Sequence, residues 1–120
     1  MSAEHRIRVA RVYDQPSDDD GVRILVDRVW PRGFRKDDPR VGHWFKDAAP
    51  SAELRHWYDH RPERFDEFVS RYEQELSTPE GQAAVAGLRE LIGSHTATLV
   101  TATRELAGSQ AAVLAELLNS

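Results

Sequence analysis

The chain of 120 residues contains no cysteine. Disulfide bonds, thiolate catalysis and cysteine-ligated metal sites are therefore excluded. Apolar runs are short: none approaches the length needed to span a bilayer, and the N-terminus lacks the apolar core of a signal peptide. These absences predict a cytoplasmic protein without a membrane partner.

The common nucleotide and catalytic fingerprints are also missing. The sequence holds no P-loop, no G-x-G-x-x-G motif and no G-x-S-x-G elbow, so no cofactor is indicated. The net charge of −4 argues against nucleic-acid binding by the whole surface. What is present, with 40% apolar and 30% charged residues, is typical of a globular protein with a single domain over residues 1–120.

Three segments have the pattern of β-strands. Residues 6–13 alternate between polar and apolar, whereas 22–26 and 96–103 are rich in apolar and β-branched residues, as in buried strands. Helices are predicted from capping residues and from apolar spacing. The predicted helices cover residues 51–60, 62–76, 78–93 and 109–118, and one further helical turn is predicted at 43–46.

The first two strands are joined by residues 14–21, a run of turn-forming residues. A parallel connection normally needs a dozen or more residues. A hairpin is therefore the simplest interpretation, and a shortened crossover is the alternative. The element order β-β-α-α-α-β-α predicts an α/β fold. We expect a small three-layer sandwich in which helices flank a short, mostly parallel, Rossmann-like sheet.

The segment after the strand at 22–26 contains most of the candidate functional side chains. Parallel strands end at one edge of a sheet, so this segment is expected beside the residues that follow the last strand. Asp27 is the one acid in this ring of cations, and would act as a general base or hold an arginine in an ion pair. Trp30 would stack on a ligand or pack as core. The groups expected here that suit an anion are Arg28, Arg32, Arg104 and Ser109 at a helix start.

Two histidines raise the question of a metal site. His56 and His60 stand four residues apart with Asp59 between them, a spacing seen in helical metal sites. The helix must end directly afterwards, before Pro62, and no third strong ligand is evident. No metal site is therefore predicted.

The run Val-Asp-Arg-Val-Trp-Pro-Arg-Gly at residues 26–33 is long and specific. On this run and the further motifs given below, the chain resembles the DUF488 family, in its short YeaO-like branch, over nearly its whole length. The family is defined as a domain of unknown function. The further motifs are Tyr13-Asp14-x-Pro16, Trp44-x-Lys46, Ala49-Pro50-Ser51-x-x-Leu54-Arg55 and Arg71-Tyr72.

The resemblance bears on both topology and mechanism. Longer relatives place a helix between the first two strands, which implies that residues 14–21 are a shortened crossover and that the strands are parallel. Longer relatives also carry a cysteine on the last strand and a Cys-His-Arg step at the following helix. Here Thr101–Glu105 and Gly108–Ala112 contain neither cysteine nor histidine. A mechanism based on that thiol or imidazole is therefore not transferred to this chain.

Two classes of function stay open. The first is an enzyme that acts on a small anionic, phosphate- or nucleotide-like substrate, with Asp27 as general base and Trp30 stacking on the substrate. The second is a non-catalytic anion-binding or protein-interaction module that uses the same cations. The anion-binding residues would be Arg28, Arg32, Lys46, Arg55 and Arg104, with the helix N-caps Ser51 and Ser109 near the site.

Two structural alternatives accompany these hypotheses. The arginines of the 26–33 run would be chiefly architectural if Lys46, Asp47 and Glu53 belong to the same network of ion pairs. The aromatic pairs Trp44-Phe45 and Trp57-Tyr58 would form a homodimer interface if they are exposed.

Overall fold

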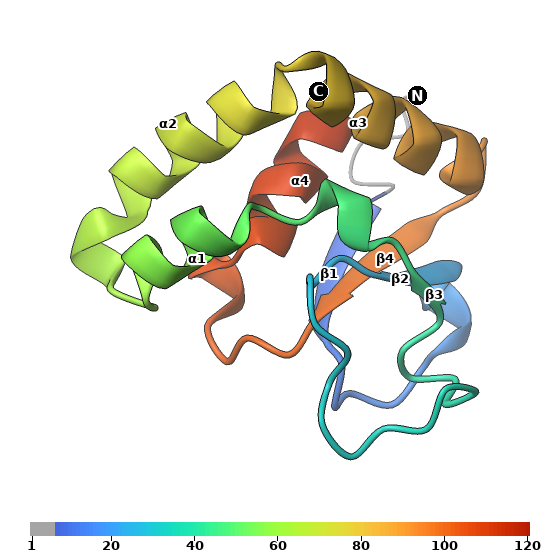
Figure 1. Ribbon diagram of the computed structural model, residues 1–120. Coiled ribbons are helices and arrows are strands. Elements are labelled where there is room, and N and C mark those ends of the chain that lie inside the picture. The colour runs from blue at the N-terminus through green and yellow to red at the C-terminus, as the bar shows by residue number, and fades with distance from the viewer. Residues whose placement is uncertain (1–6) are drawn as a thin grey trace.

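The computed structural model describes residues 7–120 and has an α/β fold. Its sheet contains four strands, all parallel, in the spatial order β1-β4-β2-β3 (Figure 1). Position 6, where the first strand was expected to begin, lies outside the described residues. The strands are β1 (Ile7–Arg11), β2 (Val22–Leu25), β3 (His43–Trp44) and β4 (Ala97–Thr101).

The strands β1 and β2 do not pair with each other, because both pair with β4. Ile7 and Val22 flank the same residue, Ala97, and both pairings are parallel. The hairpin interpretation is therefore wrong and the shortened crossover is correct. The connection passes a single strand, about 10 Å in two strand spacings, which a short extended segment can span. It ends at Gly21, where φ is 64° and a Cβ atom would lie 1.9 Å from the Thr96 carbonyl oxygen.

The predicted helical turn at 43–46 is the second correction. His43 and Trp44 instead form β3, which pairs with β2, and the Phe45 amide donates a hydrogen bond to the Leu25 carbonyl at 2.8 Å. A short 3₁₀ turn, Lys46–Ala48, follows the strand. The pairing satisfies backbone groups along the free edge of β2, and this tertiary contact outweighs the local helical pattern.

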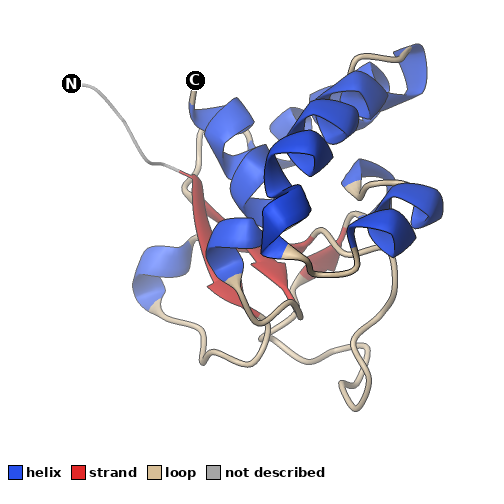
Figure 2. Cartoon of the chain, turned by 90° about the vertical axis from the view of Figure 1, so that its left-hand side faces the viewer, coloured by secondary structure: helices blue, strands red, loops and turns tan. Residues whose placement is uncertain are grey.

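Four α-helices lie on one face of the sheet (Figures 1 and 2). Three begin where predicted: the side-chain oxygens of Ser51, Thr78 and Ser109 each accept a hydrogen bond from a backbone amide in the first turn. The helix expected from residue 62 starts as a 3₁₀ turn, Pro62–Arg64. The α-helices are α1 (Ala52–Tyr58), α2 (Phe65–Leu76), α3 (Pro79–Ile92) and α4 (Gln110–Asn119).

The two faces of the sheet bury different partners. Ile24 and Leu99 face the helices, and they belong to the larger apolar cluster with residues of all four helices. Leu25 and Val100 face the other way, where Val41 and partly buried loop side chains cover them. The layer on this second face is thus the loop before β3, which Figure 1 shows on the side of the sheet opposite the helices. Alternate strand residues therefore point to opposite layers, as expected for a sheet buried on both faces.

A buried arginine holds the second face together. The Arg23 guanidinium lies 2.7 Å from Asp20 Oδ2, and it also donates to the carbonyl oxygens of Arg40 at 2.8 Å and Asp14 at 3.1 Å. Its side chain is 5% exposed and that of Asp20 is 10% exposed. One guanidinium on β2 therefore anchors the crossover and the loop before β3.

We expect Asp20→Asn to lower the free energy of unfolding by about 3 kcal/mol, because it leaves the buried Arg23 charge unpaired. Chemical denaturation measures this loss. The control is Asp37→Asn, which removes the carboxylate from an ion pair with Arg35 whose side chains are 80% and 86% exposed. The control should unfold like the wild type. Equal stability of both variants would contradict the anchoring role.

The same pair predicts an acid dependence. Burial alone would raise the pKa of Asp20, but the Ser17 amide and Arg23 outweigh it, and the pKa lies below 3.8. A lowered pKa in the folded state stabilises the protein above pH 3.8, and this contribution is lost as the pH falls through the folded pKa. The stability gap between the wild type and Asp20→Asn should therefore shrink below pH 3.8 in the same denaturation series.

Candidate functional site

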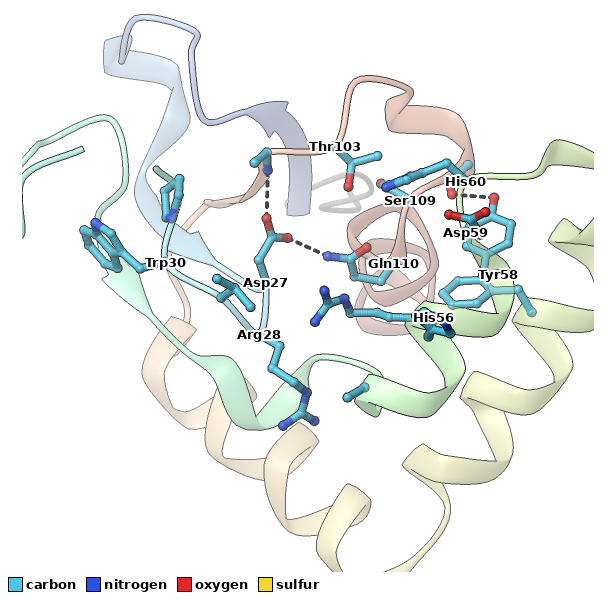
Figure 3. A pocket seen from close by; sticks show the side chains of 17 residues that line it. Asp27, Arg28, Trp30, His56, Tyr58, Asp59, His60, Thr103, Ser109 and Gln110 are labelled. Atoms are coloured by element: carbon cyan, nitrogen blue, oxygen red, sulfur yellow. Dashed lines mark hydrogen bonds between the residues drawn. The ribbon is translucent and has the colours of Figure 1, made fainter. Parts of the chain in front are cut away.

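A cleft of about 560 Å³ opens where β2 and β4 end. Its walls come from three places: the residues after β2, the helix α1 with the turn that follows it, and the segment from β4 to the first turn of α4 (Figure 3). We call it the Asp27 cleft. A parallel sheet is expected to place its binding cleft outside the carboxyl ends of its strands. The polar residues that line it include Asp27, Arg28, Arg55, His56, Asp59, His60, Thr103, Ser109 and Gln110.

Asp27 connects three elements through its carboxylate. Oδ1 accepts hydrogen bonds from the Thr101 hydroxyl at 2.6 Å and from the Gln110 side-chain amide at 2.5 Å, and Oδ2 accepts one from the Ala102 amide at 2.8 Å. Figure 3 shows the bond to Gln110 across the floor of the cleft. The backbone oxygen of Asp27 accepts a fourth bond, from the Trp44 indole at 2.8 Å. Asp27 thereby joins the end of β2 to β3, β4 and α4.

The environment of this carboxyl changes its acidity. Burial raises the pKa of Asp27 above 3.8, although the donors at Ala102, Thr101 and Gln110 and the charge of Arg55 act in the opposite direction. Desolvation thus outweighs the hydrogen bonds that favour the ionised form. The predicted role as general base stays a prediction.

The predicted cations occupy different environments. Arg28 donates to the carbonyl oxygens of Pro50 at 3.0 Å and Ala49 at 3.4 Å. It is directed away from Asp27 (Figure 3), so it holds the segment before α1. Arg55 is exposed on α1 and lines the cleft. Of these two matched arginines, Arg55 is the one whose guanidinium is left for a ligand.

Three further predicted cations lie outside the lining of the cleft. Arg32 is exposed in the loop after β2. Lys46 is also exposed, and its ammonium lies 5.1 Å from the centre of the Trp44 ring. Arg104 lines a neighbouring groove. Anion binding by these residues stays a prediction.

Trp30 lines the cleft but is tied to its surroundings. Its indole nitrogen donates to the Phe34 carbonyl at 2.8 Å, and its ring forms a T-shaped pair with the ring of Trp44, with 5.3 Å between centroids. It also packs against the apolar cluster on the second face of the sheet. Stacking on a ligand would use only the part of the ring that faces the cleft.

The two predicted N-cap serines serve as caps, and only one lines the cleft. Ser51 donates its hydroxyl to Glu75 Oε2 at 2.6 Å and accepts the Leu54 amide at 3.1 Å, which ties α1 to α2. Ser109 is buried in the wall of the cleft, donates to the Leu106 carbonyl at 2.7 Å and accepts the Ala112 amide at 3.2 Å. Both hydroxyl groups are thus engaged within the fold.

Sequence reasoning missed two residues of the cleft. Gln110 is buried and donates to Asp27. Tyr58 stacks on Phe68 with 4.3 Å between ring centroids, and its hydroxyl donates to the Gly108 carbonyl at 2.8 Å. A glutamine at the first position of the helix after the last strand was the one available signal for Gln110, because this position faces the same sheet edge as Asp27.

The histidines lie in the cleft without forming a metal site. His56 and His60 line it together with Asp59, but no group of three His, Cys, Asp or Glu residues within 7–120 is arranged to hold a metal ion. The helix ends as expected, because Asp59 and His60 both adopt positive φ, at 49° and 55°.

The aromatic pairs considered for a homodimer are partly covered. The guanidinium groups of Arg64 and Arg71 lie over the Trp57 ring, at 5.2 and 4.3 Å from its centre, and Tyr58 is buried. Trp44 is 40% exposed. A homodimer and a cytoplasmic location stay predictions. No helix within the described residues is both long and apolar enough to cross a membrane.

Comparison with known proteins places these features in a family. Residues 6–120 match the family model described as the inactive DUF488-N3 subclade. An uncharacterised protein of Mycobacterium tuberculosis (strain H37Rv) is 62% identical over 119 residues, which cover 99% of this chain and 98% of that protein. The uncharacterised protein YeaO of Escherichia coli (strain K12) is 35% identical over 114 residues, which cover 95% and 97%. No solved structure matches the chain significantly.

The contacts of Asp27 predict its titration. A carboxyl-carbon NMR titration should give Asp27 a midpoint above 3.8. In Gln110→Ala the midpoint should rise further, because a donor to the ionised form is lost. The control Gln82→Ala, an exposed residue of α3, should leave it unchanged.

The raised pKa of Asp27 also predicts how its contribution to protein stability changes with pH. A carboxyl whose pKa is raised by folding stabilises the protein below pH 3.8, and this contribution disappears as the pH rises through the folded pKa. An Asp27 midpoint at or below 3.8 would contradict the dominance of burial over the three donors.

Proposed function

Because the chain belongs to the DUF488 family, in the subclade described as inactive, we propose that it is a non-catalytic module that binds a small anionic ligand in the Asp27 cleft. The cleft has the volume of an ordinary small-molecule site, about 560 Å³. The ligands would be small anions such as phosphate esters.

The polar groups of the cleft fall into two sets: those that form hydrogen bonds within the fold, and those whose side chains do not. This difference supports the proposal. The Asp27 carboxylate and the Ser109 hydroxyl are occupied by hydrogen bonds within the fold. By contrast, the side chains of Arg55, His56 and His60 form no hydrogen bond or ion pair within residues 7–120, although all three residues line the cleft. The groups left for a ligand are thus one guanidinium and two imidazoles, which suit an anion.

A second candidate function rests on the raised pKa of Asp27. A half-buried carboxyl in a cleft, with a raised pKa, is a common feature of general acids and bases. In that enzyme, Asp27 would accept a proton from a substrate held by Arg55. The family description and the three hydrogen bonds that the Asp27 carboxylate accepts within the fold favour the non-catalytic module.

Removal of one cation tests the binding proposal. We expect Arg55→Ala to weaken the binding of inorganic phosphate by about tenfold or more, because its guanidinium is the fixed positive charge in the cleft that, unlike that of Arg28, makes no hydrogen bond within residues 7–120. Isothermal titration calorimetry measures the change. The control is Arg35→Ala, whose side chain is 86% exposed in the loop before β3 and lies outside the cleft lining. Similar losses in both variants would contradict the site.

A turnover assay separates the two candidates. For each phosphate ester that binds the wild type, the module predicts no product over a long incubation. Asp27→Asn should then retain most of the affinity, provided that its NMR spectrum shows a folded protein. Product formed by the wild type and absent in a folded Asp27→Asn variant would instead establish the enzyme.

A further inference from the structure

A second hollow adjoins the Asp27 cleft. It has a volume of about 1050 Å³ and lies between the start of α2 and the segment that follows β4. Pro62, Phe65 and Ala107 contribute apolar surface to it; we call it the Phe65 groove. Several residues line both hollows, among them Tyr58 and Gly108. The two hollows therefore meet along the contact between α1 and the segment before α4.

The two hollows meet where Gly108 contacts the Tyr58 hydroxyl group. Gly108 has no side chain, and a Cβ atom built there would lie 3.1 Å from the Tyr58 hydroxyl oxygen. The hydrogen bond from Tyr58 to the Gly108 carbonyl fixes this wall in place. A larger residue at 108 would displace the Tyr58 hydroxyl and crowd the passage between the cleft and the groove.

The chemistry changes from one hollow to the other. The cleft presents Arg55 and His56, whereas the groove presents the half-buried ring of Phe65 next to Pro62. One face of Phe65 already packs on Phe68, with 6.3 Å between ring centroids and 27° between the planes. The ring also packs on Tyr58, with 6.3 Å between centroids and 42° between the planes. The part of the ring that lines the groove is the part that a planar ligand group would contact.

We propose that the ligand of the Asp27 cleft is an anion that carries an aromatic group, and that this group lies in the Phe65 groove while the anionic group lies at Arg55. This inference rests on the proposed function and adds the second half of the ligand. A phosphate group alone occupies a small part of the two hollows. A planar ring would fill the groove, exclude water from Phe65 and stack on it.

The rim of the groove fits the same ligand. Arg104 and His60 lie at the groove, and His60 also lines the cleft. An acid, Glu105, is the one carboxylate among the residues that line the groove. Arg104 thus places one positive charge at the groove in addition to Arg55 in the cleft, which suits a ligand with negative charge.

Three probes test the inference in calorimetry: inorganic phosphate, cyclohexyl phosphate and phenyl phosphate. We expect phenyl phosphate to bind about tenfold more tightly than inorganic phosphate, with cyclohexyl phosphate between them. Ala107→Trp should fill the groove and abolish the gain while leaving inorganic phosphate unaffected. The matched control Ala86→Trp places the same ring on an exposed position of α3 and should preserve the gain.

Phe65→Leu supplies an independent variant, because it keeps apolar volume and removes the ring. It should reduce the affinity for phenyl phosphate to that for cyclohexyl phosphate. Phenyl phosphate that binds no better than inorganic phosphate, or a gain that survives Ala107→Trp, would overturn the inference and leave the anion site intact. If none of the three probes binds, both the proposed function and this inference fail.

Discussion

The hydrogen bonds of Asp27 hold the carboxyl edge of the sheet together. Its carboxylate accepts donors from Thr101, Ala102 and Gln110, and its backbone oxygen accepts the Trp44 indole. One residue after β2 thus fixes the ends of β3 and β4 and the first turn of α4. Thr101, Ala102 and Gln110 are thereby held together at the wall of the cleft that β4 and α4 supply. Burial makes the ionised carboxylate costly, and the three donors offset only part of that cost.

A second constraint explains how so short a chain completes the fold. The connection between β1 and β2 contains no α-helix, so the second face of the sheet is covered by loop. Loops cover apolar surface only when their backbone groups are satisfied. Arg23 meets this need, since it pairs with Asp20 and donates to the carbonyl oxygens of Asp14 and Arg40. The helices cover the opposite face of the sheet, and the cleft lies at the carboxyl edge of the strands.

The parts of the fold that depend on local chemistry could be predicted from the sequence. The caps at Ser51, Thr78 and Ser109 act within one helical turn, so their residue types suffice to locate them. The two-residue strand β3 could not be predicted, because pairing with β2 determines it. In the site, the sequence pointed to both Arg28 and Arg55. Only the tertiary structure separates them, since Arg28 is taken up by the carbonyl oxygens of Ala49 and Pro50.

Ligand recognition in the Asp27 cleft is tested most directly by locating a bound anion. Amide NMR shifts of the uniformly labelled protein would be recorded during a titration with phenyl phosphate. We predict saturable changes at Arg55, His56, His60 and Gln110, which line the cleft, with further changes at Phe65 in the groove. Changes confined to the exposed cations Arg32 and Lys46, or no saturable change at all, would contradict the account.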